Sequence, residues 1–243
     1  MAYSPDGRQL LTGSFDGTLR LWNSASGAQL RTFQGRTRGV RSAVFSPDGR
    51  TVVSGSMGAI MGPATPTLEL WDVETGERRQ AIDLGGSFVE GVAFAPDGGS
   101  VLAATFGRGV AHVPLAAGAT PKWLGGEARG RVKAVAFSPA GKLAASGEFS
   151  GGARLWEVAT GKLLRALGAE ERGGAVFAVV FTPDGRSVVT GAADGTITLW
   201  DPDSGDMKAS LEAHRGPVWA LAFSPDGSLL ASGGEDGVIR LWR

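Results

Sequence analysis

Three side chains near the end of the chain have the chemistry of a hydrolytic triad. Ser232, His214 and Asp236 are a nucleophile, a base and an orienting acid, and such a set activates a hydroxyl when the three are hydrogen-bonded in series. No glycine-flanked turn between a strand and a helix presents the serine to a substrate. The chain has only two histidines and no cysteine, which leaves little other acid–base or nucleophilic chemistry. We therefore expect no catalytic residues and a chain that is not an enzyme.

A second candidate is an acidic turn that could hold a hard cation. Residues 201–206, Asp-Pro-Asp-Ser-Gly-Asp, are rich in oxygen ligands of the kind that calcium prefers. Residues 72–77, Asp-Val-Glu-Thr-Gly-Glu, stand in the same register of another repeat, where acidic residues simply favour a turn. The bidentate glutamate of a calcium-binding loop is also missing. We expect no metal site and no cofactor.

The chain that must position these residues is a sixfold repeat. Ser-Pro-Asp-Gly or a close copy recurs at intervals of 42, 49, 43, 44 and 42 residues, with its proline at Pro5, Pro47, Pro96, Pro139, Pro183 and Pro225. A period of about 40 to 45 residues built from short strands is typical of a β-propeller blade. The repeat predicts one domain, residues 1–243, with units at about 1–33, 34–84, 85–125, 126–168, 169–212 and 213–243.

The last unit shows how each blade is built. Residues 218–223 and 229–232 form apolar runs of strand length on either side of the Ser224–Gly227 turn, in which proline, aspartate and glycine each favour a tight reversal. Asp236-Gly237 is a hairpin signal that leads into a third strand at 238–242. Earlier units add a fourth strand, for example 163–167 and 207–211. We predict an all-β fold, a six-bladed β-propeller of four-stranded antiparallel blades, with the first and last blades incomplete.

The end of the third strand carries a recurring Leu-Trp pair that identifies a family resemblance. Its tryptophans are Trp22, Trp71, Trp156, Trp200 and Trp242, and aspartate follows at Asp72 and Asp201. Over nearly the whole chain, the units resemble the WD-repeat family. The resemblance implies that a histidine, a serine or threonine, the turn aspartate and the tryptophan form a structural hydrogen-bond set inside a blade. Only the last unit has all four, His214, Ser232, Asp236 and Trp242. The first and fifth lack the histidine but keep Thr12, Asp16, Trp22 and Thr190, Asp194, Trp200.

Three places depart from the repeat. The second unit lengthens a hairpin at residues 57–67, which should project from one face. The third unit lacks its tryptophan and has Pro114, which makes its third strand the least certain one. The first unit lacks the start of its inner strand, and the last lacks its outer strand. In the family, an N-terminal segment commonly supplies that outer strand. We therefore expect a fragment or a misassigned start, with a longer parent that could carry a seventh blade. Otherwise the open edge of the last blade should self-associate.

The most promising binding residues lie at the hairpin tips between the second and third strands. The first four units carry a large apolar residue there, Phe15, Met57, Phe106 and Phe149, whereas the last two have Ala193 and Glu235. The resemblance places these tips on the narrower face of the propeller, together with Arg41, Glu90, Lys133, Phe177 and Trp219 on the inner strands. Aromatic and arginine side chains dominate binding energy at protein interfaces. The alternative is that each phenylalanine folds back against its own blade.

The predicted function is a non-catalytic scaffold that binds a protein or peptide on this face. A rival interpretation makes the chain the sensor or regulatory part of a larger bacterial signalling or enzymatic protein, and an enzyme with its active site in the central channel is a third. Lys+Arg and Asp+Glu both number 24, so no net field favours nucleic acid. The apolar runs are too short to span a membrane. Because no signal peptide is recognised, we expect a cytoplasmic protein.

Overall fold

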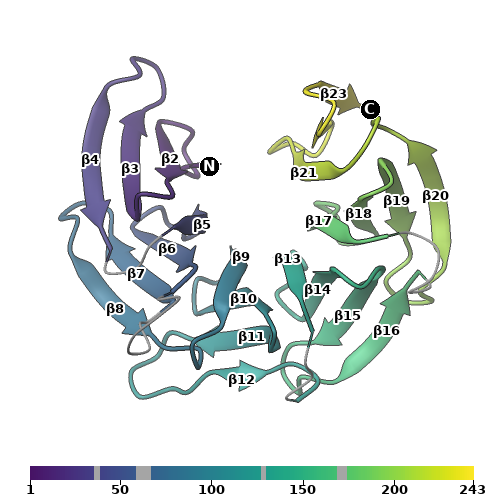
Figure 1. Ribbon diagram of the computed structural model, residues 1–243, viewed down its shortest axis with the longest axis horizontal. Helices are drawn as coiled ribbons and strands as arrows, with labels where there is room; N and C mark the ends of the chain where they lie inside the picture. Colours follow the sequence, from purple (N-terminus) through teal and green to yellow (C-terminus); the bar gives the residue numbers. More distant parts are fainter. Residues whose placement is uncertain (36–38, 59–66, 127–129, 169–173) are drawn as a thin grey trace. The chain divides into compact units, whose positions relative to one another are not determined.

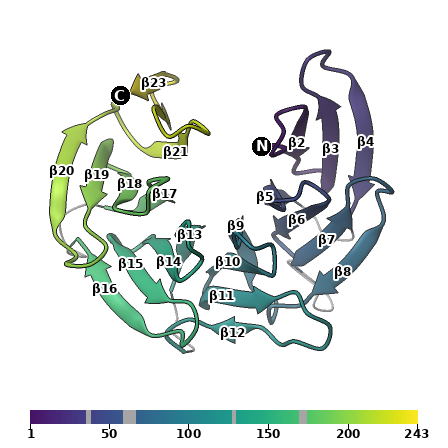
Figure 2. The ribbon, with the colours of Figure 1, turned by 180° about the vertical axis from the view of Figure 1, so that it is seen from behind.

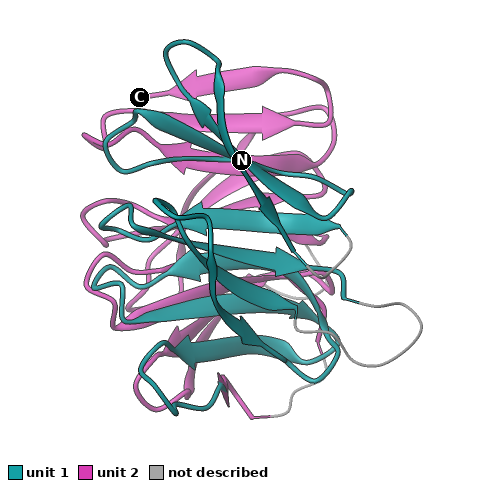
Figure 3. Ribbon diagram, turned by 90° about the vertical axis from the view of Figure 1, so that its left-hand side faces the viewer, with its two compact units in different colours: residues 1–121 teal, residues 122–243 magenta. Residues whose placement is uncertain are grey.

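A computed structural model describes residues 1–35, 39–58, 67–126, 130–168 and 174–243. In these ranges the regular secondary structure consists of β-strands alone (Figure 1). No helix that could cross a membrane occurs in this part of the chain. Two compact units divide the chain, Met1–Pro121 and Lys122–Arg243, shown in different colours in Figure 3.

Unit 1 contains the first three blades. Within each blade, consecutive strands pair antiparallel, so every connection inside a blade is a local hairpin. Blade 1 is β1 Ala2–Tyr3, β2 Gln9–Gly13, β3 Thr18–Asn23 and β4 Gln29–Gln34; blade 2 is β5 Val40–Phe45, β6 Thr51–Ser56, β7 Leu68–Asp72 and β8 Arg78–Ile82; blade 3 contains β9 Phe88–Phe94, β10 Ser100–Phe106 and β11 Gly109–Pro114.

Unit 2 begins with the two-residue strand β12 (Lys122–Trp123) and contains the last three blades, again with antiparallel neighbours in chain order (Figure 2). Blade 4 is β13 Val132–Phe137, β14 Leu143–Glu148, β15 Ala153–Glu157 and β16 Leu163–Leu167; blade 5 is β17 Val176–Phe181, β18 Val188–Ala192, β19 Thr196–Trp200 and β20 Met207–Glu212; blade 6 is β21 Val218–Phe223, β22 Leu230–Gly234 and β23 Ile239–Trp242.

The predicted fold class is confirmed, since the described chain is all-β and forms six antiparallel propeller blades. The first and last blades are the smaller ones, because β1 has two residues and blade 6 has three strands. The uncertain third strand of the third unit is present as β11, with Pro114 at its last position, where a proline costs no internal ladder bond.

The repeated Ser-Pro-Asp-Gly turn is a hydrogen-bonded unit that also joins neighbouring blades. In blade 2, the Ser46 hydroxyl and the Arg50 amide both donate to Asp48 Oδ1, at 2.5 and 3.0 Å. Gly49 has φ of 70°, which favours glycine. Its α-carbon also faces Pro5 of the preceding turn, which a Cβ would meet at 3.5 Å. The same glycine–proline contact recurs at Gly98–Pro47, Gly185–Pro139 and Gly227–Pro183.

The hydrophobic core lies between successive blades rather than inside them. One cluster joins Leu19, Leu21 and Phe33 of blade 1 to Phe45 and Trp71 of blade 2, with the Phe33 and Trp71 rings edge to face at 5.9 Å. Equivalent clusters join blade 4 to blade 5 and blade 5 to blade 6. The leucine face of one blade therefore packs on the tryptophan face of the next, and no single blade encloses a core by itself.

Candidate functional site

A β-bulge near the start of the first strand positions the predicted inner-strand residues. In blade 6, Val218 pairs with Gly234 and Ala220 with Gly233, so Trp219 is left without a partner in the ladder. A bulge redirects the side chain of its extra residue and often occurs beside functional sites. The same shift occurs in blades 2 to 5, where it leaves out Arg41, Glu90, Lys133 and Phe177. All five inner-strand candidates are therefore bulge residues. Each bulge lies where the first strand pairs with the end of the second strand, next to the hairpin tip.

In unit 1, a hairpin tip touches the bulge residue of the following blade. The Arg41 guanidinium lies over the Phe15 ring at 5.5 Å, and Arg41 Nη1 is 3.7 Å from a carboxylate oxygen of Glu90. Phe15 remains 71% exposed despite the cation above its ring. Gly39 lies beside Met57 and Phe15, since a Cβ there would meet Met57 Sδ at 3.1 Å and Phe15 at 3.4 Å. Unit 1 therefore presents a mixed apolar and charged cluster at this end of its blades.

In unit 2, the corresponding residues form a continuous ladder of rings. The Arg131 guanidinium lies 4.0 Å from the centroid of Phe149. Phe149 contacts Phe177 with centroids 6.3 Å apart, and Phe177 stacks on Trp219 at 4.5 Å with the ring planes 23° apart. Sequence reasoning selected these three aromatic residues from their positions in the repeat. It did not predict that they touch each other across blades, nor that Arg131 covers the first ring.

The alternative, that each phenylalanine folds back on its own blade, applies to Phe106 and in part to Phe149, whose ring is covered by Arg131 of the same blade. Phe106 pairs across the ladder with Phe88 of the same blade, and their centroids are 6.0 Å apart. Phe106 and Phe149 are about two-fifths exposed, and Met57 is half-buried. Lys133 is also half-buried. The expected projecting loop at residues 57–67 lies mostly outside the described residues.

The structural hydrogen-bond set begins with a tryptophan and a hydroxyl in every blade that has the tryptophan. The indole N–H donates to a serine or threonine on the second strand at 2.8 to 3.0 Å, in the pairs Trp22–Thr12, Trp71–Ser54, Trp156–Ser146, Trp200–Thr190 and Trp242–Ser232. A buried N–H needs such an acceptor, because leaving it unpaired costs desolvation energy. These bonds fasten the third strand to the second through side chains.

In blade 6 the predicted four-residue set is joined in series. Ser232 Oγ accepts the Trp242 N–H and lies 2.7 Å from His214 Nε2, while His214 Nδ1 lies 2.9 Å from Asp236 Oδ1. Arg240 donates to the other carboxylate oxygen at 2.9 Å. The hydrogen bond from His214, followed by that from Arg240, holds the pKa of Asp236 well below its usual range. Ser232 is buried and already bonded on both sides, an arrangement that favours a structural role over nucleophilic attack.

The turn aspartates of blades 1 and 5 do not extend the set. Asp16 accepts hydrogen bonds from the amide and hydroxyl of Thr18, and Asp194 does the same with Thr196. The Thr18 hydroxyl is the largest cause that lowers the pKa of Asp16 to about 2. Without the histidine, no side chain of the described residues bridges these carboxylates to Thr12 or Thr190, and Asp16 bonds Arg20 of its own hairpin as well.

Blade 4 contains a substitute that sequence reasoning missed. The buried carboxylate of Glu148 accepts a hydrogen bond from the Ser146 hydroxyl at 2.8 Å and lies 3.5 Å from Arg154 Nη1. Ser146 in turn accepts the Trp156 N–H. Glu148 thus stands where His214 stands in blade 6, as the next partner of the hydroxyl. A glutamate at the end of the otherwise uncharged strand-length run Leu143–Glu148 was the available signal.

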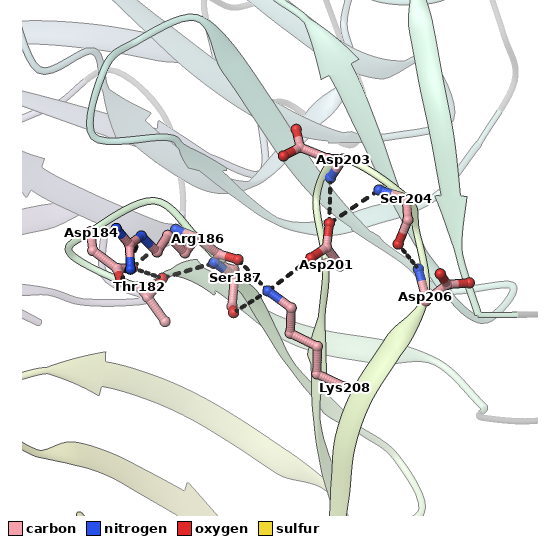
Figure 4. Close-up of polar contacts among 9 residues, drawn as sticks. All are labelled: Thr182, Asp184, Arg186, Ser187, Asp201, Asp203, Ser204, Asp206 and Lys208. Atoms are coloured by element: carbon pink, nitrogen blue, oxygen red, sulfur yellow. Dashed lines mark hydrogen bonds and ion pairs between the residues drawn. The ribbon is translucent and has the colours of Figure 1, made fainter.

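The acidic turn at residues 201–206 has the geometry of a hydrogen-bonded turn. Asp201 Oδ1 accepts the amides of Asp203 and Ser204 at 2.8 and 3.1 Å, and Lys208 Nζ is 2.9 Å from the other oxygen. Lys208 is the largest cause that lowers the pKa of Asp201 to about 2. Figure 4 shows the carboxylates of Asp203 and Asp206 pointing away from that of Asp201. The three carboxylates are therefore not arranged around a common point.

A pocket of about 870 Å³ lies in unit 1 at the opposite end of the blades from the hairpin tips. It is lined by the Ser-Pro-Asp turns of blades 1 and 2 and by the turn at Asp72. Two of its three arginines already have partners: Arg31 donates to the carbonyls of Glu74 and Thr75, and Arg79 is bonded to Asp72. The Arg31 contacts join blade 1 to blade 2, whereas the Arg79–Asp72 contact lies within blade 2, so both arginines serve the packing of the blades.

Together, the blades, their inter-blade cores and the side-chain network define a β-propeller of repeated four-stranded units. The family model described as WD domain, G-beta repeat matches residues 1–23, 27–60, 122–157, 161–201 and 205–243, which is more than half of the chain. The chain belongs to the WD-repeat family. Propellers of this family are generally non-catalytic scaffolds that bind protein partners.

Two curated proteins match short parts of the chain. One is the Periodic tryptophan protein 2 homolog of Caenorhabditis elegans, 40% identical over 55 residues, which is 23% of this chain and 6% of that protein. The other is the Nuclear distribution protein PAC1 of Mycosarcoma maydis, 44% identical over 48 residues, which is 20% of this chain and 11% of that protein. The matched parts therefore span a small fraction of each relative.

Proposed function

We propose that this chain is a non-catalytic scaffold that holds a protein or peptide partner on the surface formed by its hairpin tips and bulge residues. The observation that carries the proposal is the recurrent bulge. In five blades it takes one residue out of the ladder beside the hairpin tips. Two pairs of these bulge residues contact each other, Arg41 with Glu90 in unit 1 and Phe177 with Trp219 in unit 2. The proposed binding residues form one group in each unit: Phe15, Arg41, Met57 and Phe106 in unit 1, and Lys133, Phe149, Phe177 and Trp219 in unit 2.

The energetics of protein interfaces support this choice of surface. Aromatic and arginine side chains are enriched among residues whose truncation costs about 2 kcal/mol or more at an interface. Phe15, Phe149 and Trp219 retain much of their surface exposed although neighbouring side chains touch them. Rings held by such neighbours lose little conformational entropy when a partner binds, which favours affinity.

The composition of the chain bears on nucleic acid as a partner and on where the protein acts. The balance of charges leaves no excess of basic side chains for nucleic acid, and we propose that the protein acts in the cytoplasm on another protein. The Ser232–His214–Asp236 series serves the blade, so we propose no enzymatic activity for it.

A second proposal is that this propeller is the sensor or regulatory part of a larger bacterial signalling or enzymatic protein. The two matched relatives, covered to 6% and 11% of their lengths, show that similar repeats occur within longer proteins. An open reading frame that continues in phase before Met1 into a further domain would support it, and a stop codon immediately upstream would contradict it.

The binding surface is tested by replacing Phe15, Phe106 and Phe149 with serine in one variant. We expect the variant to lose capture of partner proteins from the source cell while its melting temperature stays close to that of the wild type. A matched control replaces three exposed apolar residues of the fourth strands, Leu30, Leu163 and Met207, with serine. This control should keep its partners.

Two outcomes would contradict the proposal. If the phenylalanine variant unfolds, the three residues belong to the core rather than to a binding surface. If both triple variants lose the same partners, capture depends on general surface hydrophobicity, and the hairpin tips have no special role.

A further inference from the structure

Within the described residues, the aromatic ladder of unit 2 has a cation at one end only. Arg131 covers Phe149 at 4.0 Å, then Phe177 and Trp219 follow in contact. Phe15 of unit 1 likewise has a guanidinium, from Arg41, over its ring. Trp219 ends the ladder with 51% of its surface exposed. Among the described residues, no cation lies over it.

The geometry of the stack indicates which part of Trp219 is exposed. Phe177 covers one face of the indole, because the two rings are nearly parallel and 4.5 Å apart. With one face covered and half of the residue's surface exposed, the solvent-accessible part of the indole lies on its other face and its edges. Tryptophan is also the aromatic side chain that binds a cation best. The end of the ladder therefore offers an open indole face for a positively charged group.

A carboxylate accompanies this indole at the tip of the same blade. The Glu235 amide donates to the Pro217 carbonyl at 2.9 Å, which holds Glu235 beside the start of β21, two residues before Trp219. The Glu235 side chain is exposed and folds toward Gly216, since a Cβ there would lie 3.3 Å from Oε2. In the described part of the chain, its carboxylate makes no ion pair or hydrogen bond. An open indole face and an exposed carboxylate therefore lie at one end of one blade.

We propose that Trp219 and Glu235 form a binding site for an arginine side chain of a partner segment. A planar guanidinium can stack on an aromatic face and bond a carboxylate at its edge, whereas a lysine ammonium is a compact, strongly hydrated point charge. The partner's arginine would continue a pattern that the chain already contains, with guanidinium groups over Phe149 and Phe15. The inference rests on the proposed function and specifies the chemistry of the partner at one end of the surface.

Of the two acidic residues at this hairpin tip, Glu235 is the one whose carboxylate is available to a partner. Asp236 is already bonded to His214 and Arg240. Arg215 is the nearest basic residue in sequence, and its backbone amide donates to Asp236 at 3.2 Å. The Arg215 side chain makes no ring contact with Trp219 in the structure, but among the described residues it is the cation best placed in sequence to compete for the site, so the experiment includes it.

The test titrates the 243-residue protein with the peptide acetyl-Ala-Ala-Arg-Ala-Ala-amide and follows the indole N–H resonances by NMR. The Trp219 signal is assigned as the one that Trp219→Phe removes. We expect this signal to shift with a millimolar dissociation constant, as suits a single side chain. A peptide with citrulline in place of arginine, equal in shape but uncharged, should leave the signal unmoved, and a lysine peptide should bind more weakly than the arginine peptide.

Two variants distinguish the effect of the Glu235 carboxylate on peptide binding from the effect of the protein's overall charge. Glu235→Gln should raise the dissociation constant of the arginine peptide about two- to fivefold, the range expected for an exposed ion pair. Glu77→Gln, at an exposed turn in unit 1, should leave the dissociation constant unchanged. If Arg215 occupies the indole in solution, Arg215→Gln will shift the Trp219 signal without any peptide, and the proposal is overturned. Equal shifts with arginine and citrulline, or none at millimolar concentration, would overturn it too.

These outcomes are distinct from those of the proposed function. Phe15, Phe106 and Phe149 do not line the arginine site, so the serine variant of these residues tests partner capture separately. Loss of capture in that variant, together with failure of the arginine peptide, would leave the scaffold proposal standing and remove only this site.

Discussion

Single hydrogen bonds between side chains determine how the tryptophans of this chain are used. Each indole N–H of the recurring Leu-Trp pair donates to a hydroxyl on the neighbouring strand, and that hydroxyl is the point at which blades differ. In blade 6 the hydroxyl of Ser232 is also hydrogen-bonded to His214, and in blade 4 the hydroxyl of Ser146 donates to Glu148. The common step satisfies a buried donor, while the second step varies with the residues available.

At this scale we predict that Asp236→Asn destabilises the protein at neutral pH. The folded pKa of Asp236 lies below its ordinary value near 4, because the carboxylate is bonded to His214 and Arg240. A lowered folded pKa gives stability that is present above the unfolded pKa and is lost as pH falls through the folded pKa. The gap in unfolding free energy between wild type and variant should therefore narrow below about pH 4.

Urea denaturation at a series of pH values measures this gap. Asp194→Asn is the matched control, because the Asp194 carboxylate bonds only within its own hairpin, to Thr196, and its loss at pH 7 should be smaller. A gap for Asp236→Asn that stays constant from pH 7 to pH 2 would show that the charge of Asp236 does not support the fold.

Strands of successive blades approach closely at a repeated glycine on the second strand. A Cβ at Gly13, Gly55, Gly147 or Gly191 would come within 3.0 Å of the valine near the start of the next blade's first strand, Val40, Val89, Val176 or Val218 respectively. None of these glycines has a positive φ. Close packing, rather than turn geometry, is therefore the reason for glycine at these positions.

We predict that Gly191→Ala destabilises the protein by about 1–3 kcal/mol, the usual cost of overpacking a core. The added methyl would lie 2.7 Å from Val218 Cγ1 and 3.4 Å from its carbonyl oxygen. Gly233→Ala is the matched control in blade 6, where the Cβ would meet only Ala220 at 4.0 Å. Guanidinium denaturation of both variants measures the difference. Equal losses would mean that glycine is needed for some reason other than contact with the next blade.

For the molecule as a whole, the faces of the blades decide stability, because each core is shared by two neighbours. In unit 2, Ile197 of blade 5 is fully buried against blade 6. Ile239 stands at the equivalent position of blade 6 and is 76% exposed, with Leu241 65% exposed beside it. In the described part of the chain, β23 pairs only with β22. An exposed apolar strand with one unpaired edge is a site for association with another chain.

We therefore predict that the 243-residue chain self-associates and that Ile239→Lys with Leu241→Lys reduces this association. Charged residues on an edge strand oppose pairing between chains, and these two side chains have little buried surface to lose. Light scattering on a size-exclusion column measures the mass, and the melting temperature should change little. A wild-type chain that is already a monodisperse monomer would contradict the prediction.

The sequence by itself determined the blades, because their signals are local. Proline, aspartate and glycine in the turns and Asp-Gly at the hairpins act within a few residues, so strands such as 218–223 and 163–167 were predicted at their observed bounds. The positions of Phe149, Phe177 and Trp219 in the repeat were also readable. Only the tertiary structure decided that bulges redirect Phe177 and Trp219, that these rings stack, and that Glu148 takes the place of histidine. The stacked rings come from different blades, so their contacts depend on how the blades pack. Which side chain bonds the Ser146 hydroxyl likewise depends on what surrounds it in the folded protein.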